Sequence, residues 1–471
     1  MNILLIRVID SNISRIITFP IGIMYLAGYI EQHIPQVKIK ILDTQLCDDP
    51  KAEIDNLTNN WIPNIIGLSA MSVDKAALHS LIRLIRPCFL NAKIIVGGSY
   101  ASAEPENVLS DELIDYCIVG EGEEPFYFLL SELLQGKDIA EDRRLFSKER
   151  LVNKGQPLFV PVDKLSYPAY HLVNVEKYFA ARPKEVHFPF FLKKRVMPIM
   201  FSRGCPYHCS FCHNIFGKEI RYRNIDRIIG ELAMLRSSYH AQEILVLDDC
   251  FNANLKVAKE IMREIIKKNF GLLFNFAVGI RADQVDAELA RLLLKAGTYH
   301  VALGIESGSE KIQEAIGKNL SLKRAKQSIN LLATERIATT GFFMLGFPDE
   351  TREDVFKTIQ FARESLLTFA DSSFVVPFPG TRMYNELAAK KEIENLEISK
   401  YISNPFVRLH INLSNMSNQE LIKLKMTFAI KFHLSIRRLI IMIKTLGLFK
   451  LGKIVAHYYQ LIFRYIFKYG Y

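Results

Sequence analysis

The sequence has no run of about 18 uninterrupted apolar residues, which is the length that a membrane-spanning helix requires. Its first residues also lack the basic region and the small-residue cleavage site of a signal peptide. Cysteine is scarce, and the seven cysteines are an odd number, which argues against a secreted protein built on disulfides. These absences predict a cytoplasmic protein in a reducing compartment.

Acidic residues are missing from one region. Residues 421–471 contain ten lysines and arginines and no aspartate or glutamate. Since the whole chain has 60 basic and 50 acidic residues, the remainder carries 50 of each. The net charge of +10 therefore comes from the tail, and we expect no nucleic-acid partner for the body of the chain.

Short apolar runs alternate with amphipathic stretches over the first 135 residues. This alternation is typical of a parallel sheet with helices on both faces, and five such units fit a Rossmann-like, flavodoxin-like domain. A ligand of such a domain binds at the carboxyl ends of the strands. The expected strands are 2–6, 37–42, 65–69, 93–96 and 115–119, and the expected helices include 22–32, 74–86 and 123–134.

A second α/β series follows a proline-rich linker. Its six β/α units fit a complete or partial TIM barrel, and the sequence leaves open whether the barrel closes. The strands are expected at 197–202, 243–248, 273–279, 300–305, 339–345 and 371–376, with helices at 254–268, 286–295 and 321–335. The predicted fold class is therefore α/β, with a Rossmann-like domain at 1–135, a linker at 136–196, a (β/α)6 partial barrel at 197–385 and a helical basic tail at 386–471.

Three cysteines, Cys205, Cys209 and Cys212, lie within eight positions directly after the first expected barrel strand, where a barrel places its chemistry. Soft thiolates select zinc or an iron–sulfur cluster. A zinc site would need a fourth ligand such as His208 or His213, and a redox dithiol at the last two cysteines is a further alternative. We favour the cluster, because three protein ligands leave one iron open for a substrate.

The spacing C-x3-C-x2-C, with Phe211 before the last cysteine, resembles the signature of the radical SAM superfamily. In that family the cysteines hold a [4Fe-4S] cluster, and one electron from it cleaves S-adenosylmethionine (SAM) to a 5′-deoxyadenosyl radical. Further resemblance extends over residues 197–383, including Gly304-Ile-Glu-Ser and the Gly341 to Thr351 element. It implies SAM contacts at Phe211, Asp248, Glu306 and Gly346.

Each of these SAM contacts has a plain structural alternative. Glu306 could be an acid satisfied by backbone amides, and Gly346 could belong to an ordinary strand-to-helix turn. Asp248 stands in an Asp-Asp-Cys-Phe element where many radical SAM enzymes have Gly-Gly-Glu. Asp-Asp-x-Phe also occurs in the cobalamin-dependent branch of the family, so it could replace the usual element.

Two expected strands of the first domain end in glycine pairs, around Gly97-Gly98 and Gly120-Glu-Gly122. Such glycines permit sharp βα turns or close contact with a large flat ligand. In this order they resemble the cobalamin-binding domain that is fused to radical SAM enzymes, and the resemblance covers most of residues 1–135. It implies cobalamin contacts at Ser69, Gly97, Gly98, Ser99, Gly120 and Glu121.

The first domain departs from that family pattern in two respects. Tyr100 replaces the histidine that usually follows the double glycine, and the motif that supplies a lower histidine ligand to cobalt is absent. His33 and His79 lie on helical stretches, where we expect structural roles. We therefore expect no histidine below a bound cobalamin, and a domain without cobalamin remains an alternative. A methylthiotransferase would instead need a second cluster on Cys47, Cys88 and Cys117.

The tail begins with a helix signal at Ser417 to Glu420, which resembles a capping box. Beyond it, basic residues interleave with apolar and aromatic ones to residue 471. Such a segment can lie on an anionic membrane surface. It can equally pack on the barrel with a solvated basic face.

Together these features predict a radical SAM enzyme that depends on cobalamin and methylates an unactivated carbon. By family resemblance, one SAM would methylate cobalamin and a second would yield the radical that abstracts a substrate hydrogen. The alternatives are a cobalamin-assisted cyclase or rearrangement enzyme, and a non-catalytic regulatory protein that binds zinc or cobalamin. The expected partners are a small-molecule or lipid-like substrate, an electron donor such as flavodoxin or ferredoxin, and a membrane surface for residues 421–471.

Overall fold

The computed structural model describes residues 1–11, 17–136, 145–147, 159–181, 191–393 and 408–446. The chain forms two compact units. The first comprises Met1–Arg182, Phe211–Gly217 and Pro377–Ser403, and the second comprises Pro183–Ser210, Lys218–Val376 and Asn404–Tyr471.

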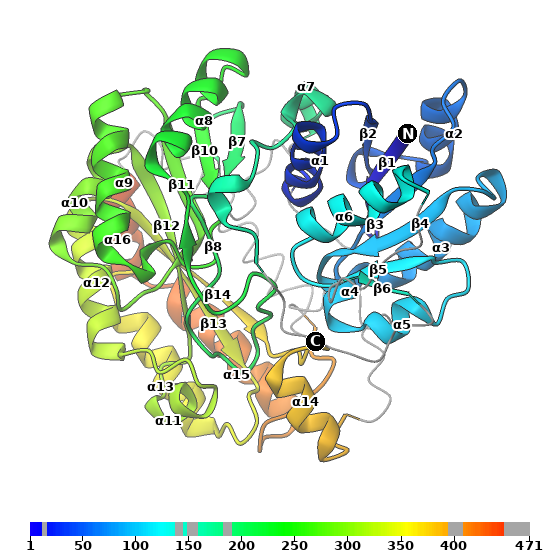
Figure 1. Ribbon diagram of the computed structural model, residues 1–471. Helices are drawn as coiled ribbons and strands as arrows, with labels where there is room; N and C mark the ends of the chain where they lie inside the picture. The colour runs from blue at the N-terminus through cyan, green and yellow to red at the C-terminus, as the bar shows by residue number, and fades with distance from the viewer. Residues whose placement is uncertain (12–16, 137–144, 148–158, 182–190, 394–407, 447–471) are drawn as a thin grey trace. The chain divides into compact units, whose positions relative to one another are not determined.

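The first unit is built on a sheet with the strand order β2-β1-β3-β4-β5-β6 (Figure 1). The first five strands are parallel and β6 is antiparallel to β5. The order confirms the Rossmann-like, flavodoxin-like prediction, to which the short strand β6 is an addition. The strands are β1 (Asn2–Arg7), β2 (Lys38–Asp43), β3 (Ile65–Ser69), β4 (Lys93–Gly97), β5 (Tyr116–Ile118) and β6 (Leu145–Phe146).

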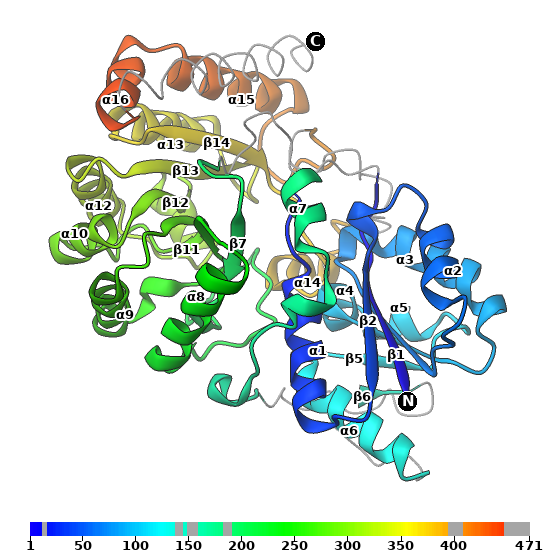
Figure 2. The same cartoon turned by 90° about the horizontal axis from the view of Figure 1, so that it is seen from above.

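Helices cover both faces of this sheet, because their apolar residues recur at helical spacing. In α3 (Lys75–Ile85) the residues Leu78, Ile82 and Ile85 are buried on one side. Figure 2 shows α1 (Ile21–His33) and α6 (Glu123–Leu134) on one face, with α2 (Pro50–Thr58) and α3 on the other. The shorter helices are α4 (Gly98–Ala103), α5 (Pro105–Leu109) and α7 (Val175–Ala181).

The second unit contains six parallel strands in the order β14-β13-β12-β11-β10-β7. This is the (β/α)6 arrangement that the sequence predicted. Among the described strands β7 and β14 form the two edges, so the barrel is partial. The strands are β7 (Val196–Ile199), β10 (Glu243–Val246), β11 (Leu273–Ile280), β12 (Thr298–Glu306), β13 (Ala338–Leu345) and β14 (Phe369–Phe374).

The first barrel strand ends earlier than expected. β7 stops at Ile199, and β8 (Ser202–Arg203) pairs antiparallel with β9 (Arg221–Tyr222). The Asp248 carboxylate accepts hydrogen bonds from the Phe201 amide at 2.8 Å and the Ser202 hydroxyl at 2.5 Å. Hydrogen bonds to the Asp248 side chain thus take the place of strand pairing at these residues. The chain between β8 and β9 contains the three cysteines.

The helices of the second unit lie around the outside of its sheet (Figure 2). Those that precede β14 are α8 (Ile225–Ser238), α9 (Leu255–Lys268), α10 (Ala287–Lys295), α11 (Glu310–Ala315), α12 (Leu322–Thr334) and α13 (Arg352–Glu364). Helix α14 (Arg382–Ala389) belongs to the first unit. None of the helices in the described ranges combines the length and apolar content that crossing a bilayer requires.

The described part of the tail packs on the barrel. Ser417 caps α15 (Asn418–His433) by accepting a hydrogen bond from the Glu420 amide. On the next helix, α16 (Ile436–Leu446), the buried Arg438 stacks 3.8 Å from the Phe432 ring and donates to the Ala362 carbonyl at 3.1 Å. Residues 447–471, which carry the last part of the membrane prediction, lie outside the described ranges.

Candidate functional site

The carboxyl edge of the barrel sheet gathers most of the predicted SAM contacts. Asp248, Glu306 and Gly346 follow or end β10, β12 and β13. Because the strands are parallel, these three positions lie at one edge of the sheet, where β/α barrels carry their chemistry. Phe211 lies in Phe211–Gly217, a segment that groups with the first unit.

The cysteine loop is held by contacts with several elements of the second unit. The Gly204 amide donates to Asp249 at 3.1 Å, and the Ser210 amide donates to the Ile316 carbonyl at 2.8 Å. Cys205 and Cys209 are half-buried, whereas Cys212 is exposed. Within the described ranges, no three His, Cys, Asp or Glu side chains are already arranged as a metal site. Ligation of a cluster by these cysteines therefore stays a prediction.

The chemistry of the loop suits a soft metal centre. A hydrogen bond with the Cys250 thiol lowers the pKa of Cys205, which favours the thiolate form that binds iron. Burial raises the pKa of Cys209, and a metal would have to displace that proton. Burial also lowers the pKa of His213, which favours its neutral ring. The donor set fits an iron–sulfur cluster on three cysteines.

Glu306 occupies a strained and well-anchored position at the end of β12. Its φ of 65° lies in the left-handed region, which is unfavourable for a glutamate. Gln313 holds this conformation, because its Nε2 donates to the carbonyls of Ile305 at 2.7 Å and Ser307 at 2.6 Å, on either side of Glu306. Strain that the surrounding structure maintains in this way is typical of ligand-binding positions.

Lys318 is the partner of Glu306. Its Nζ lies 2.8 Å from Glu306 Oε1, and the two side chains are each 11% exposed. Burial opposes the lysine charge, but the Glu306 carboxylate outweighs it and holds the pKa of Lys318 above its ordinary value. The pair presents one carboxylate in a fixed orientation at the carboxyl edge, as contact with the ribose or amino group of SAM would require.

Asp248 and its neighbour Asp249 have different environments. Asp248 is fully buried, and this burial raises its pKa to about 7 despite the hydrogen bonds from Ser202 and Phe201. Asp249 is exposed and accepts the Gly204 amide of the cysteine loop. Of the two carboxylates, Asp249 is the one that reaches solvent beside the loop, and the sequence prediction did not single it out.

Gly346 marks a tight turn after β13. Its φ is 92°, and its amide donates to Glu350 Oε2 at 2.6 Å. Burial raises the pKa of Glu350 to about 7. Glu350 therefore holds the turn from inside the protein, and the Gly346 backbone supplies the edge of the site.

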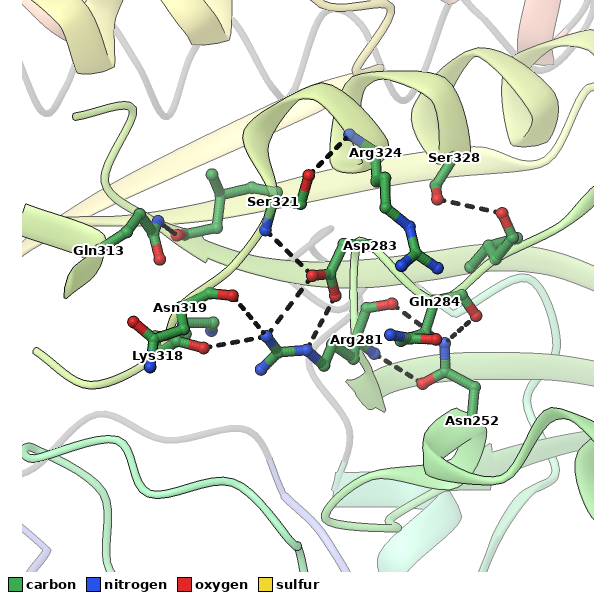
Figure 3. Close-up of polar contacts among 12 residues, drawn as sticks. Asn252, Arg281, Asp283, Gln284, Gln313, Lys318, Asn319, Ser321, Arg324 and Ser328 are labelled. Atoms are coloured by element: carbon green, nitrogen blue, oxygen red, sulfur yellow. Dashed lines mark hydrogen bonds and ion pairs between the residues drawn. The ribbon is translucent and has the colours of Figure 1, made fainter. Parts of the chain in front are cut away.

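Arg281 and Tyr207 also belong to this site, and sequence reasoning missed both. Arg281 directly follows β11 and forms an ion pair with Asp283 at 2.8 Å (Figure 3). Its guanidinium lies 3.6 Å from the centre of the Tyr207 ring, inside the cysteine loop. The one signal in the sequence is an Arg-x-Asp element placed directly after an expected strand.

The predicted cobalamin contacts form a second group, at the carboxyl edge of the first sheet. A Cβ on Gly98 would lie 2.8 Å from both the Ala70 carbonyl oxygen and Ser69 Oγ, so only glycine fits there. Its φ of 91° is also a backbone conformation that favours glycine. The Ser102 hydroxyl donates to the Gly98 carbonyl at 2.8 Å and accepts the Gly120 amide at 3.0 Å. The ends of β4 and β5 are thereby joined, and the Tyr100 amide, which donates to the Ala70 carbonyl at 3.2 Å, links them to the end of β3.

The remaining predicted cobalamin contacts differ in exposure. Ser99 is half-buried in α4. Glu121 is buried, and its carboxylate accepts the Val160 amide at 3.1 Å. Glu121 thus ties the β5–α6 turn to a neighbouring segment of the same unit. The glycine backbone of Gly97, Gly98 and Gly120 forms the edge that a flat ligand could approach.

His33 and His79, for which the sequence predicted structural roles, both contact neighbouring side chains of the first unit. His79 Nδ1 lies 2.7 Å from Asp111, and Nε2 lies 3.1 Å from the buried Tyr100 hydroxyl. His33 packs 4.2 Å from Tyr29, ring centre to ring centre. Both rings therefore have partners within the first unit.

Two family models match the chain. The radical SAM superfamily matches residues 199–362, and the B12 binding domain matches residues 14–130. The first match falls on the second unit apart from Phe211–Gly217, and the second match falls on the first unit. They coincide with the two groups of predicted site residues.

Curated relatives match most of the chain. The uncharacterized methyltransferase PH0819 of Pyrococcus horikoshii is 29% identical over 436 residues, covering 90% of each chain. Cytidylyl-2-hydroxyethylphosphonate methyltransferase of Streptomyces wedmorensis is 27% identical and covers 78% of each chain. Anaerobic magnesium-protoporphyrin IX monomethyl ester cyclase of Rubrivivax gelatinosus is 24% identical, covering 82% of this chain and 69% of the relative.

The fold also matches a solved structure. The radical SAM methyltransferase TsrM of Kitasatospora setae, determined with cobalamin and a [4Fe-4S] cluster bound, gives a TM-score of 0.67 at 19% identity and covers 83% of this chain and 75% of TsrM. With both family models in place, this chain belongs to the cobalamin-dependent radical SAM enzymes, whose cofactors are a [4Fe-4S] cluster, SAM and cobalamin.

Proposed function

We propose that this protein transfers a methyl group to an unactivated carbon of a small molecule. The observation that carries the proposal is the anchored Glu306–Lys318 pair at the same barrel edge as the cysteine loop. It occurs in a chain that also has a glycine-lined B12 domain. Both named methyltransferase relatives are similar over more than three quarters of their length.

Each residue of the site has a separate task in this proposal. Cys205, Cys209 and Cys212 hold the cluster, Glu306 orients SAM, and Gly98 lets cobalamin approach the backbone. When bound, the cluster supplies an electron to SAM and cobalamin carries the methyl group. Lys318 holds the Glu306 carboxylate in a fixed orientation, so that the cosubstrate meets a preorganised partner.

The experiment that tests this proposal is anaerobic purification of the full chain with hydroxocobalamin. We expect bound iron and sulfide, a corrin spectrum and formation of 5′-deoxyadenosine from SAM. The variant with Cys205, Cys209 and Cys212 all changed to alanine should form no deoxyadenosine. Cys88→Ala, an exposed cysteine of the first unit, is the matched control and should behave as the unaltered protein. Deoxyadenosine from the triple variant would refute the cluster assignment.

A cobalamin-assisted cyclase is the second candidate, favoured by the similarity to the magnesium-protoporphyrin cyclase. Methyl transfer and cyclisation differ in the fate of the SAM methyl group. Label from [methyl-13C]SAM should appear in the product of a methyltransferase and be absent from the product of a cyclase. If the product is unlabelled and deoxyadenosine is formed, the protein is a cyclase and not a methyltransferase.

The tail supports a further part of the proposal, which is peripheral contact with an anionic membrane. Helices α15 and α16 and the turn between them expose five apolar side chains, and Ile436 is 81% exposed. The set comprises Ile422, Ile430, Leu434, Ile436 and Ile440, interspersed with exposed Lys423, Lys431, Arg437 and Lys444. Apolar residues flanked by lysine and arginine suit the headgroup region of anionic lipid.

Vesicle co-sedimentation tests this contact. The protein should sediment with vesicles of phosphatidylcholine and phosphatidylglycerol and stay in solution with phosphatidylcholine alone. Ile436→Asp should weaken sedimentation, whereas Ile62→Asp, at an isolated site that is 72% exposed in the first unit, should not. Equal sedimentation of all three proteins would rule out α16 as the contact.

A further inference from the structure

Arg281 joins three segments that follow different barrel strands. Its Nη2 donates to the carbonyls of Lys318 at 2.9 Å and Asn319 at 3.3 Å, both in the loop between α11 and α12. Its own amide donates to Asn252 Oδ1 at 2.8 Å, beyond β10. Figure 3 shows the guanidinium between Asp283 and these two carbonyls. The side chain is 7% exposed, so these contacts are shielded from water.

Asp283 closes the same network from the other side. Its Oδ1 accepts Arg281 Nε at 2.8 Å, and its Oδ2 accepts the Ser321 amide at 3.0 Å. Ser321 caps α12, so the carboxylate fixes the start of that helix together with the arginine. A planar guanidinium can hold a carboxylate and two carbonyls at once, which a lysine ammonium on a flexible stem cannot reproduce.

Arg281 also contacts the cysteine loop. The Arg281 guanidinium lies 3.6 Å from the centre of the Tyr207 ring, between Cys205 and Cys209 in sequence. Stacking of a guanidinium on a tyrosine face is a cation–π contact. Arg281 thus contacts the loop through Tyr207 and contacts the backbone of Lys318, whose side chain fixes Glu306.

We propose that Arg281 is a positioning residue that sets the cysteine loop and the Glu306–Lys318 pair relative to one another. The loop and the pair lie on different segments, and Arg281 contacts both. This inference rests on the proposed function, since it assigns the cysteines to the cluster and Glu306 to SAM. Its structural content, that Arg281 restrains the loop, can be measured without any cofactor.

The first test measures alkylation of the cysteines by iodoacetamide in reduced, cluster-free protein, read out by peptide mass spectrometry. Arg281→Lys keeps the positive charge beside the thiols. It loses the stacking of the guanidinium on the Tyr207 ring and the guanidinium hydrogen bonds to Asp283 and the two carbonyls. We expect Cys205 and Cys209 to react about five- to thirty-fold faster, which corresponds to loss of a cation–π contact worth about 1–2 kcal/mol. The exposed Cys212 should react at an unchanged rate.

Arg438→Lys is the matched control. Arg438 is also buried, stacks 3.8 Å from the Phe432 ring and donates to backbone carbonyls, but it lies on α16. It should leave the alkylation rates unchanged. Tyr207→Leu removes the stack and leaves the Arg281–Asp283 pair. It should raise the alkylation rates of Cys205 and Cys209 as Arg281→Lys does. If Arg281→Lys does not fold, Tyr207→Leu decides the question alone.

The second test uses the loaded enzyme and a spectroscopic readout. The electron paramagnetic resonance signal of the reduced cluster should respond to SAM, and Arg281→Lys should need at least about tenfold more SAM for that response. Unchanged alkylation and unchanged SAM response would overturn the proposal. Absence of any SAM-responsive cluster in the unaltered protein would instead overturn the proposed function, and the alkylation rates would still report on Arg281.

Discussion

The Glu306–Lys318 pair permits a test that separates stability from cosubstrate binding. The change is Glu306→Gln, which keeps the shape of the side chain and removes its charge. At 2.8 Å and an effective dielectric constant of about 20, the attraction within the pair is about 6 kcal/mol, much of it offset by desolvation. Removing one partner of a buried pair costs about 3–5 kcal/mol. Because each side chain is 11% exposed, we expect a loss near the lower value.

The double variant Glu306→Gln/Lys318→Met supplies the second half of this test. It leaves no uncompensated charge, so its unfolding midpoint in urea should return close to that of the unaltered protein. SAM affinity should not return with it. A hydrogen bond to a charged group is worth about 1.5–3 kcal/mol, so both variants should bind SAM about ten- to a hundredfold more weakly. Urea unfolding followed by circular dichroism and anaerobic equilibrium dialysis with SAM measure the two quantities.

The exposed Glu310 on α11 provides the control, because Glu310→Gln removes a carboxylate close by in sequence without breaking a buried pair. It should change neither quantity. If the double variant recovers SAM affinity together with stability, Glu306 has only a structural role. If Glu306→Gln unfolds at the same urea concentration as the unaltered protein, the pair is not buried as described.

Three further predictions concern single residues. Gly98→Ala should abolish the corrin spectrum of protein purified with hydroxocobalamin while iron binding persists, because its Cβ would lie 2.8 Å from the Ala70 carbonyl; retained corrin would contradict the close approach. Burial lowers the pKa of His300 to about 3, so the unfolded chain binds a proton more readily below pH 6.5 and stability should fall by up to about 1.4 kcal/mol per pH unit from there toward pH 3. In urea titrations at several pH values, His300→Gln should show a smaller dependence of the unfolding free energy on pH. An unchanged dependence would argue against a neutral, buried His300. Burial raises the pKa of Asp248 to about 7, so stability should fall as pH rises from about 4 to 7; Asp248→Asn should flatten this fall, and equal slopes would show that Asp248 is not neutral in the fold.

The sequence by itself determined the layout of the fold, because the relevant signals are local. A strand that is buried on both faces must be apolar throughout, and a helix that covers the sheet must have apolar residues about every 3.6 positions. These two patterns predict the five parallel strands of the first sheet and the six of the barrel. The cysteine spacing was equally local. So was the glycine at position 98, whose left-handed backbone and close contacts explain why no side chain is present there.

Only the tertiary structure decided which side chains meet across that layout. Lys318 lies 12 positions beyond Glu306, and Arg281 lies 74 positions beyond Tyr207, at separations where no local pattern predicts a contact. The same holds for Asp248, which faces the protein interior while Asp249 is exposed. The physical reason is that backbone periodicity acts between neighbours along the chain, whereas the pairing of charges depends on strand register and loop path, which only the folded sheet sets.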